Sequence, residues 1–181
     1  MEQESNNSKK SVDMVLTAIA RDRPGVVESL ADVIAAHSGN WVESSMAQLG
    51  GEFAGIVMVE VPAGATDKLE VALSALDKEG IDVTVHKAAS HAPSSGHHAR
   101  LELTGLDHTG IVLKVTRALA RHGVSIDELN TSVSRGSMGA EPIFLADADI
   151  ILPASLSLND LRDTLEQIAT DIMVDIELTD T

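Results

Sequence analysis

The sequence contains no cysteine and no tyrosine, and one tryptophan and two phenylalanines are its whole supply of large aromatic side chains. Without cysteine, the chain cannot form a disulfide framework, a thiolate metal site or a cysteine nucleophile. Residues 1–13 are polar and lack the apolar run of a secretory signal peptide, and no stretch is apolar for long enough to cross a bilayer. We therefore expect a cytoplasmic protein without membrane attachment.

Basic residues are scarce as well, with 13 lysines and arginines against 28 aspartates and glutamates and a formal net charge of -15. An acidic surface repels the phosphates of nucleic acids and of anionic lipids, so direct binding to either is disfavoured. The sequence has no Gly-x-Ser-x-Gly, no His-Glu-x-x-His and no Gly-Lys-Ser/Thr motif. Its carboxylates are scattered rather than paired, so the sequence predicts neither an enzyme nor a cofactor or metal site.

One short pattern occurs twice, as Ala-Arg-Asp-Arg-Pro-Gly-Val-Val at 20–27 and as Gly-Leu-Asp-His-Thr-Gly-Ile-Val at 105–112. In each copy an alternating apolar run ends at an aspartate, a glycine follows three residues later, and a helical pattern begins. Such a strand-to-helix turn leaves backbone N–H groups free at the positive end of a helix. Each copy therefore predicts a small site for a carboxylate or another anion.

Hydrophobic periodicity predicts the same order of elements on both sides of the two turns. The first half reads as a strand from residue 14, a helix from 26 that ends at Ser38-Gly39 with the glycine just past the helix end, strands 40–49 and 52–61, a helix over 67–79 and a strand over 81–86. The second half reads as a strand over 100–104, a helix over 110–122, strands 125–134 and 143–152, a helix over 157–170 and a strand over 174–178.

Landmarks in the two halves are evenly separated, which indicates an internal duplication. Asp22 and Asp107 are 85 residues apart, whereas Val83 and Val174 are 91 apart. We place the six extra residues in the second hairpin, at 135–142, where glycine and proline gather.

Each half thus reads β-α-β-β-α-β, which predicts an α+β protein with two ferredoxin-like domains. Right-handed crossovers put both helices on one face of a four-stranded antiparallel sheet. The expected boundaries are a disordered tail at 1–12, domains at 13–88 and 99–181, and a linker at 89–98. Modules this small leave a sheet face and an edge strand uncovered, so we expect the sheets to associate within the chain or in a homodimer.

A β-α-β-β-α-β unit with Asp-Arg-Pro-Gly-Val-Val at 22–27 and His-Ser-Gly-Asn at 37–40 resembles an ACT domain. ACT domains are small regulatory modules that bind amino acids. Two of them in tandem, with no catalytic domain, resemble the glycine cleavage system transcriptional repressor family. The Leu-Asp-His-Thr-Gly-Ile-Val segment of the second half, at 106–112, fits that family too.

The resemblance also implies where a ligand binds, because the effector of an ACT domain sits where the first turn meets a neighbouring ACT domain. A polar residue of the turn and another at the start of the second strand hold it. The implied ligand-binding residues are Asp22, Arg23, Pro24, Gly25 and Asn40 in the first half, and Asp107, His108, Thr109, Gly110 and Ser125 in the second.

The two half-sites differ in one residue, and two of the assignments have a structural alternative. Serine is shorter than asparagine, so the two half-sites should not be equivalent. Asp22 and Asp107 could instead only cap helices, which aspartate does well. Asn40 could be only a turn residue after Gly39.

The resemblance implies a non-catalytic regulator that binds an amino acid, glycine or serine, and acts through a protein partner. That partner would be the DNA-binding transcriptional activator of the glycine cleavage operon, and the alternative is a metabolic enzyme regulated in trans. An RNA-binding module of this topology would need sheet aromatics and a basic groove. A metal chaperone would need cysteine or methionine ligands near the first loop. His91, His97 and His98 fall at the expected linker, where we expect no metal binding.

Overall fold

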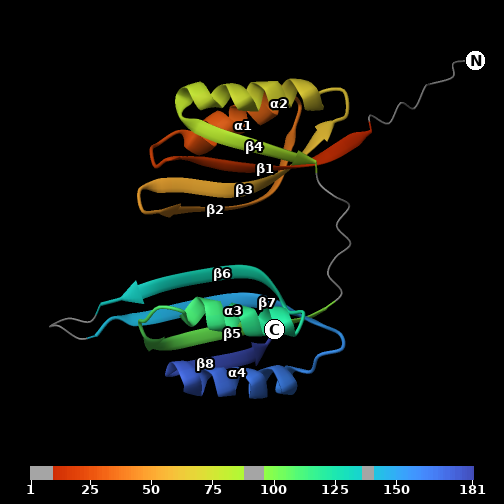
Figure 1. The fold of residues 1–181 in the computed structure, drawn as a ribbon. Helices are drawn as coiled ribbons and strands as arrows, with labels where there is room; N and C mark the ends of the chain where they lie inside the picture. Colours follow the sequence, from red (N-terminus) through yellow and green to blue (C-terminus); the bar gives the residue numbers. More distant parts are fainter. Residues whose placement is uncertain (1–9, 88–95, 136–140) are drawn as a thin grey trace, which may run out of the picture. The chain divides into compact units, whose positions relative to one another are not determined.

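The computed structural model describes residues 10–87, 96–135 and 141–181, which belong to two compact units of one topology (Figure 1). Unit 1 comprises the described residues up to 87, and unit 2 comprises those from 96 onward. Each unit is a four-stranded antiparallel sheet with its helices packed on one face, so the predicted α+β, ferredoxin-like fold is confirmed. None of the helices in these described ranges combines the length and hydropathy of a bilayer span.

Unit 1 follows the predicted order of elements. These are β1 (Ser11–Arg21), α1 (Val26–Ala36), β2 (Asn40–Leu49), β3 (Glu52–Pro62), α2 (Thr66–Ser74), a 3-10 turn η1 (Ala75–Glu79) and β4 (Ile81–Lys87). The strands are arranged in the order β2-β3-β1-β4, which leaves β2 and β4 as edges.

Unit 2 repeats this arrangement with the strand order β6-β7-β5-β8. Its elements are β5 (Gly96–Leu106), α3 (Ile111–Arg121), β6 (Ser125–Ser134), β7 (Ile143–Pro153), α4 (Leu158–Ile172) and β8 (Val174–Asp180). His97 and His98 lie in β5, and a ring nitrogen of His97 is 2.7 Å from a carboxylate oxygen of Asp180. His91 lies outside the described residues.

The core of each unit forms where alternate strand residues face the helices. In unit 1, Leu16 and Val57 from the sheet are fully buried against Leu30 and Leu73 from the helices. In unit 2, Ile150 and Leu161 take part in the same kind of contact. No polar side chain is buried in the described parts of the chain. The opposite face of each sheet is left without a covering layer within its own unit.

The strand register corrects one of the predicted equivalences between the halves. Ala20 on β1 pairs with Ile81, and Gly105 on β5 pairs with Val174. Val174 is therefore equivalent to Ile81 and not to Val83. Besides the longer hairpin, unit 2 thus has two further residues before its last strand. One extra residue lies before α4, because its N-cap Ser157 follows the end of β7 by four residues, whereas Ala65 follows the end of β3 by three. The other lies between that N-cap and the last strand.

The end of α1 also differs from its prediction. Ser38, and not Gly39, adopts the left-handed conformation, with φ 59°. The Ser38 N–H donates to the Ala35 carbonyl and the Gly39 N–H donates to the Ile34 carbonyl, which is the Schellman pattern. Gly39 is needed for space, since a Cβ there would meet Ile34 Cγ2 at 2.8 Å.

Candidate functional site

The two turns predicted as anion sites have the same backbone geometry. Gly25 and Gly110 are the N-cap residues of α1 and α3, with φ of 92° and 96°. Their carbonyls accept the first helical hydrogen bonds, from Ser29 N at 2.9 Å and from Lys114 N at 3.0 Å. A side chain strains this left-handed conformation, which explains the glycine at this position of both copies. Pro24 and Thr109 precede the caps and lie outside the helices.

A second backbone contact fixes each turn against the neighbouring hairpin. The Asp22 N–H donates to the Gly51 carbonyl at 3.0 Å, and the Asp107 N–H donates to the Pro142 carbonyl at 2.8 Å. These contacts lie at equivalent positions of the two units, so the aspartate backbone has the same place in both. The aspartate side chains are exposed in both units.

The interpretation of these aspartates as helix caps is wrong. Neither α1 nor α3 has a side-chain hydrogen bond at its N-cap. In contrast, α4 is capped by the Ser157 hydroxyl, which accepts from Asp160 N at 3.1 Å. The first-turn N–H groups of α1 and α3 therefore have no side-chain partner within the described residues, and they remain available for an anion.

The two helix termini differ in charge. A carboxylate oxygen of Glu28 lies 3.8 Å from the position that a Cβ on Gly25 would occupy, so a negative charge already stands beside the terminus of α1. The equivalent residue of α3 is Leu113, and α3 has no acidic residue in its first turn. A ligand carboxylate would meet repulsion at α1 and a bare helix terminus at α3.

Arg23 and His108, both predicted ligand residues, point toward the end of the second helical segment of their unit. Arg23 Nη2 donates to the Glu79 carbonyl at 2.8 Å. The His108 ring has Nε2 at 2.8 Å from the Ile172 carbonyl oxygen and Nδ1 at 3.1 Å from the Thr109 carbonyl oxygen. The hydrogen bond to Ile172, followed by that to Thr109, raises the pKa of His108 above its usual 6.5.

Asn40 lies far from the turn of its own unit. It is the first residue of β2, and not a turn residue, and it pairs with Glu60 on β3. Arg21, which precedes the turn, pairs with Glu52 at the other end of β3. The strand rise separates these two rungs by about 27 Å. One unit alone cannot bring Asn40 and the turn to one small ligand.

Unit 2 has the same separation. Ser125 at the start of β6 pairs with Ile151, whereas Leu106 before the turn pairs with Ile143 at the far end of β7. The structure therefore brings together the turn residues of each unit but leaves each strand-start residue at the opposite end of the sheet.

Sequence reasoning missed an apolar groove between α3 and β6. Val112, Ile126 and Leu129 line it at the surface, and each is between 37% and 43% exposed. In unit 1 the position of Ile126 is taken by Trp41, which packs against the core. The smaller isoleucine leaves this groove open in unit 2. The signal in the sequence was this exchange of tryptophan for isoleucine at equivalent positions.

Comparison with known proteins agrees with this architecture. The sequence profile of the ACT domain matches residues 13–86 and, independently, residues 99–169. No curated protein is significantly similar to the chain in sequence.

Two solved structures are similar over nearly the whole chain. An unknown protein from Galdieria sulphuraria is 28% identical, with a TM-score of 0.82 over 95% of this chain and 99% of its own. A protein assigned provisionally as a glycine cleavage system transcriptional repressor is 18% identical, with a TM-score of 0.69 over 93% of this chain and 96% of its own. The second likeness concerns the fold. Two profile matches and two units of matching topology show that this chain belongs to the ACT-domain family and carries two ACT domains in tandem.

Proposed function

We propose that this chain is a non-catalytic regulator that binds a small amino acid, glycine or serine, at its strand-to-helix turns. The single observation that supports this most is the terminus of α3. Its N-cap is Gly110 in the left-handed conformation, no side chain caps it, and its first turn has no carboxylate. A ligand carboxylate can accept from the free N–H groups there, and the Asp107 carboxylate of the same turn offers a partner for the ammonium group.

The ligand would bridge two ACT units. Because Asn40 and Ser125 lie at the far end of the sheet from their own turns, each can reach a ligand only at the turn of another unit that runs antiparallel to the first. The apolar groove between α3 and β6 offers that neighbour a contact surface. Such a neighbour would come from the same chain or from a second copy in a homodimer.

Binding between units gives a route to regulation. A ligand that contacts two units favours the arrangement in which both contacts are made, and it thereby changes the affinity for a partner that prefers one arrangement. We propose that the partner is a DNA-binding transcriptional activator, as in a glycine cleavage repressor. The two-unit length shared with the provisionally assigned repressor supports this reading. The net charge of -15 favours a protein contact over a DNA contact.

Calorimetry and thermal unfolding of the full chain test the proposal with glycine, serine and alanine as probes. A ligand at 100 times its dissociation constant raises the free energy of unfolding by about 2.7 kcal/mol. We expect Asp107→Asn and Asn40→Ala each to weaken binding. Glu43→Gln, on edge strand β2 and on the side of the sheet that the helices leave uncovered, serves as the matched surface control and should not change the affinity. If none of these amino acids produces heat or a shift in melting temperature, the sensor function is excluded.

A further inference from the structure

The sheet of unit 1 has an apolar face that none of its own helices covers. The helices α1 and α2 lie on one side of this sheet (Figure 1). Strand alternation places the following residues on the other side: Val15, Thr17, Ile19, Ser45, Ala47, Ala54, Ile56 and Met58. Ile19 is 48% exposed and Ile56 is 54% exposed. A shallow depression of about 420 Å³ lies between them and the small side chains of β2. We call this surface the open face of unit 1.

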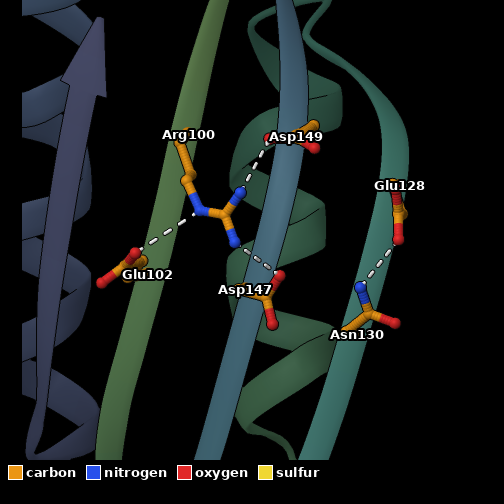
Figure 2. Close-up of polar contacts among 6 residues, drawn as sticks. All are labelled: Arg100, Glu102, Glu128, Asn130, Asp147 and Asp149. Carbon is orange, nitrogen blue, oxygen red and sulfur yellow. Dashed lines mark hydrogen bonds and ion pairs between the residues drawn. The ribbon is translucent and has the colours of Figure 1, made fainter. Parts of the chain in front are cut away.

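The same face of unit 2 has the opposite character. By register, Arg100 stands where unit 1 has Val15, and Asp147 stands where unit 1 has Ile56. Figure 2 shows the Arg100 guanidinium between three carboxylates, with N–O distances of 3.4 Å to Glu102, 3.0 Å to Asp147 and 3.6 Å to Asp149. One topology therefore tolerates either chemistry on this face, so the fold itself does not require the apolar surface of unit 1.

Carboxylates surround the open face of unit 1 on all four sides. Glu43 lies on edge strand β2 and Asp82 on edge strand β4. Asp13 and Glu60 lie at one end of the face, and Glu52 lies at the other. All of these carboxylates are exposed. The basic side chains described on this face are Arg21 and His86. The surface is thus apolar at its centre and acidic at its rim.

We infer that the open face of unit 1 is the docking surface for a protein partner whose own patch is apolar at the centre and rich in lysine or arginine around it. This inference rests on the proposed function, in which the chain acts through a protein partner. Apolar side chains exposed together on one face are a mark of an interaction site. A cationic border on the partner complements the carboxylate rim and speeds association.

A second copy of this chain fits the surface poorly. The same face of a second copy would place its carboxylate rim over the first rim, which costs free energy through like-charge repulsion. The corresponding face of unit 2 carries charged side chains at its centre. The carboxylates on that face of unit 2 are those of Glu102, Glu128, Asp147, Asp149, Asp175 and Glu177. Covering the apolar centre with that face would remove the charges from water without new partners.

Methyl NMR of the full chain tests the inference directly. The probe is an amphipathic helical peptide of leucine and lysine, with a leucine–glutamate peptide and a serine–lysine peptide as matched controls. We expect the leucine–lysine peptide to shift the methyl signals of Ile19 and Ile56. Ile143 and Ile151 lie on the corresponding face of unit 2, and their signals should stay in place. Neither control peptide should produce the shifts.

Three double variants complete the test. The variant Ile19→Thr with Ile56→Asp gives unit 1 the residues that unit 2 carries at the equivalent positions, Thr104 and Asp147. We expect it to bind the peptide about tenfold more weakly. Glu43→Gln with Asp82→Asn should weaken binding and reduce its dependence on salt. Asp147→Asn with Asp149→Asn, in unit 2, should leave binding unchanged.

Besides the absence of peptide shifts, three results would overturn the inference. The first is peptide binding that survives the Ile19→Thr, Ile56→Asp change, and the second is binding lost through the unit 2 variant. The third is sedimentation showing that the Ile19→Thr, Ile56→Asp change dissociates a dimer, since the face would then be an interface between copies. Glycine calorimetry on the same samples separates the two proposals. Intact glycine binding without peptide shifts removes only the docking surface, and peptide shifts without any amino-acid binding remove only the sensor.

Discussion

Arg23 and His108 hold equivalent turn positions, and each side chain contacts the carbonyl at the end of the second helical segment of its unit. Arg23 Nη2 lies 2.8 Å from the Glu79 oxygen, and His108 Nε2 lies 2.8 Å from the Ile172 oxygen. Both carbonyls belong to the residue two positions before the last strand of the unit. The strand-to-helix turn is therefore attached to the second helical segment in both units, through a permanently charged guanidinium in unit 1 and a titratable ring in unit 2.

The first prediction is that this attachment depends on pH in unit 2 alone. Only a protonated ring can donate from both nitrogens, to Ile172 and to Thr109. The pKa of folded His108 is raised, so its contribution to stability is fully present below the unfolded value near 6.5 and is lost as pH rises through the folded pKa. Lys114 opposes the shift and Asp107 supports it. NMR titration of the ring should therefore give a pKa above 6.5.

His108→Gln is the matched variant for this prediction. It should remove the part of the pH dependence of unit 2 stability that falls between the unfolded and folded pKa values. Arg23→Gln should lower the stability of unit 1 by an amount that does not change with pH over that range, since a guanidinium does not titrate there. A His108 pKa at or below 6.5 contradicts the role of its two carbonyl contacts.

The second prediction concerns the left-handed residues that follow the C-caps of α1 and α3. Ser38 and Gly123 are equivalent, and both are left-handed, with φ of 59° and 69°. Because a side chain is strained there, Ser38→Gly should stabilise unit 1 by about 1 kcal/mol, and Gly123→Ser should destabilise unit 2 by a similar amount. Trp41 is the single tryptophan and lies in unit 1, so its fluorescence during urea unfolding measures the first change.

Amide exchange in α3 measures the second change. A Ser38→Gly variant of unchanged or lower stability would show that the serine side chain makes a compensating contact, and it would exclude strain as the dominant effect at this position.

Local sequence patterns were sufficient for the elements and for the turn glycines. Strand and helix periods differ, and Gly25 and Gly110 each mark a left-handed backbone that other residues rarely adopt. The end of α1 was predicted one residue off because a second demand competes there. Gly39 is needed for the space beside Ile34, and the left-handed residue is Ser38.

The candidate site depended on contacts that local patterns do not contain. Arg23 and His108 were assigned to a ligand, yet each reaches a carbonyl that is more than fifty residues away along the chain. Asn40 was grouped with the turn, although the pairing of β2 with β3 puts it at the other end of the sheet. Such relations are set by sheet register and tertiary packing, which a window of neighbouring residues does not report.

The third prediction concerns the charged face of unit 2. Arg100 lies between carboxylates of β5 and β7 that would otherwise repel one another (Figure 2). Arg100→Val introduces the residue found at the equivalent Val15, and it should lower the stability of unit 2 by about 1 kcal/mol at low salt. The loss should shrink at roughly 0.5 M salt, where the repulsion is screened.

Amide exchange of β5 at two salt concentrations measures this effect. Adding Asp147→Asn and Asp149→Asn to the Arg100→Val variant should restore stability, because the repelling charges are then gone. A loss that is equal at low and high salt would instead assign the role of Arg100 to the packing of its aliphatic stem.

The fourth prediction separates ligand affinity from helix stability at the two turns. A carboxylate in the first turn favours a helix but competes with an anionic ligand for the same terminus. Leu113→Glu should therefore stabilise α3 by about 0.5 kcal/mol and weaken glycine or serine binding at its turn roughly fivefold. Glu28→Leu, the reverse exchange, should destabilise α1 by a similar amount and strengthen binding at the turn of unit 1. Calorimetry gives the affinities and amide exchange gives the helix stabilities.

Leu113→Gln is the control that removes the apolar side chain without adding charge. It should leave the affinity near that of the unchanged protein, because the helix terminus stays free of negative charge. If Leu113→Gln and Leu113→Glu weaken binding equally, the apolar surface next to α3 holds the ligand or the neighbouring unit, and the α3 terminus does not act as the carboxylate site. Competition for the helix terminus predicts that Leu113→Glu raises helix stability and lowers affinity, and that Glu28→Leu lowers helix stability and raises affinity. No other explanation produces this paired reversal.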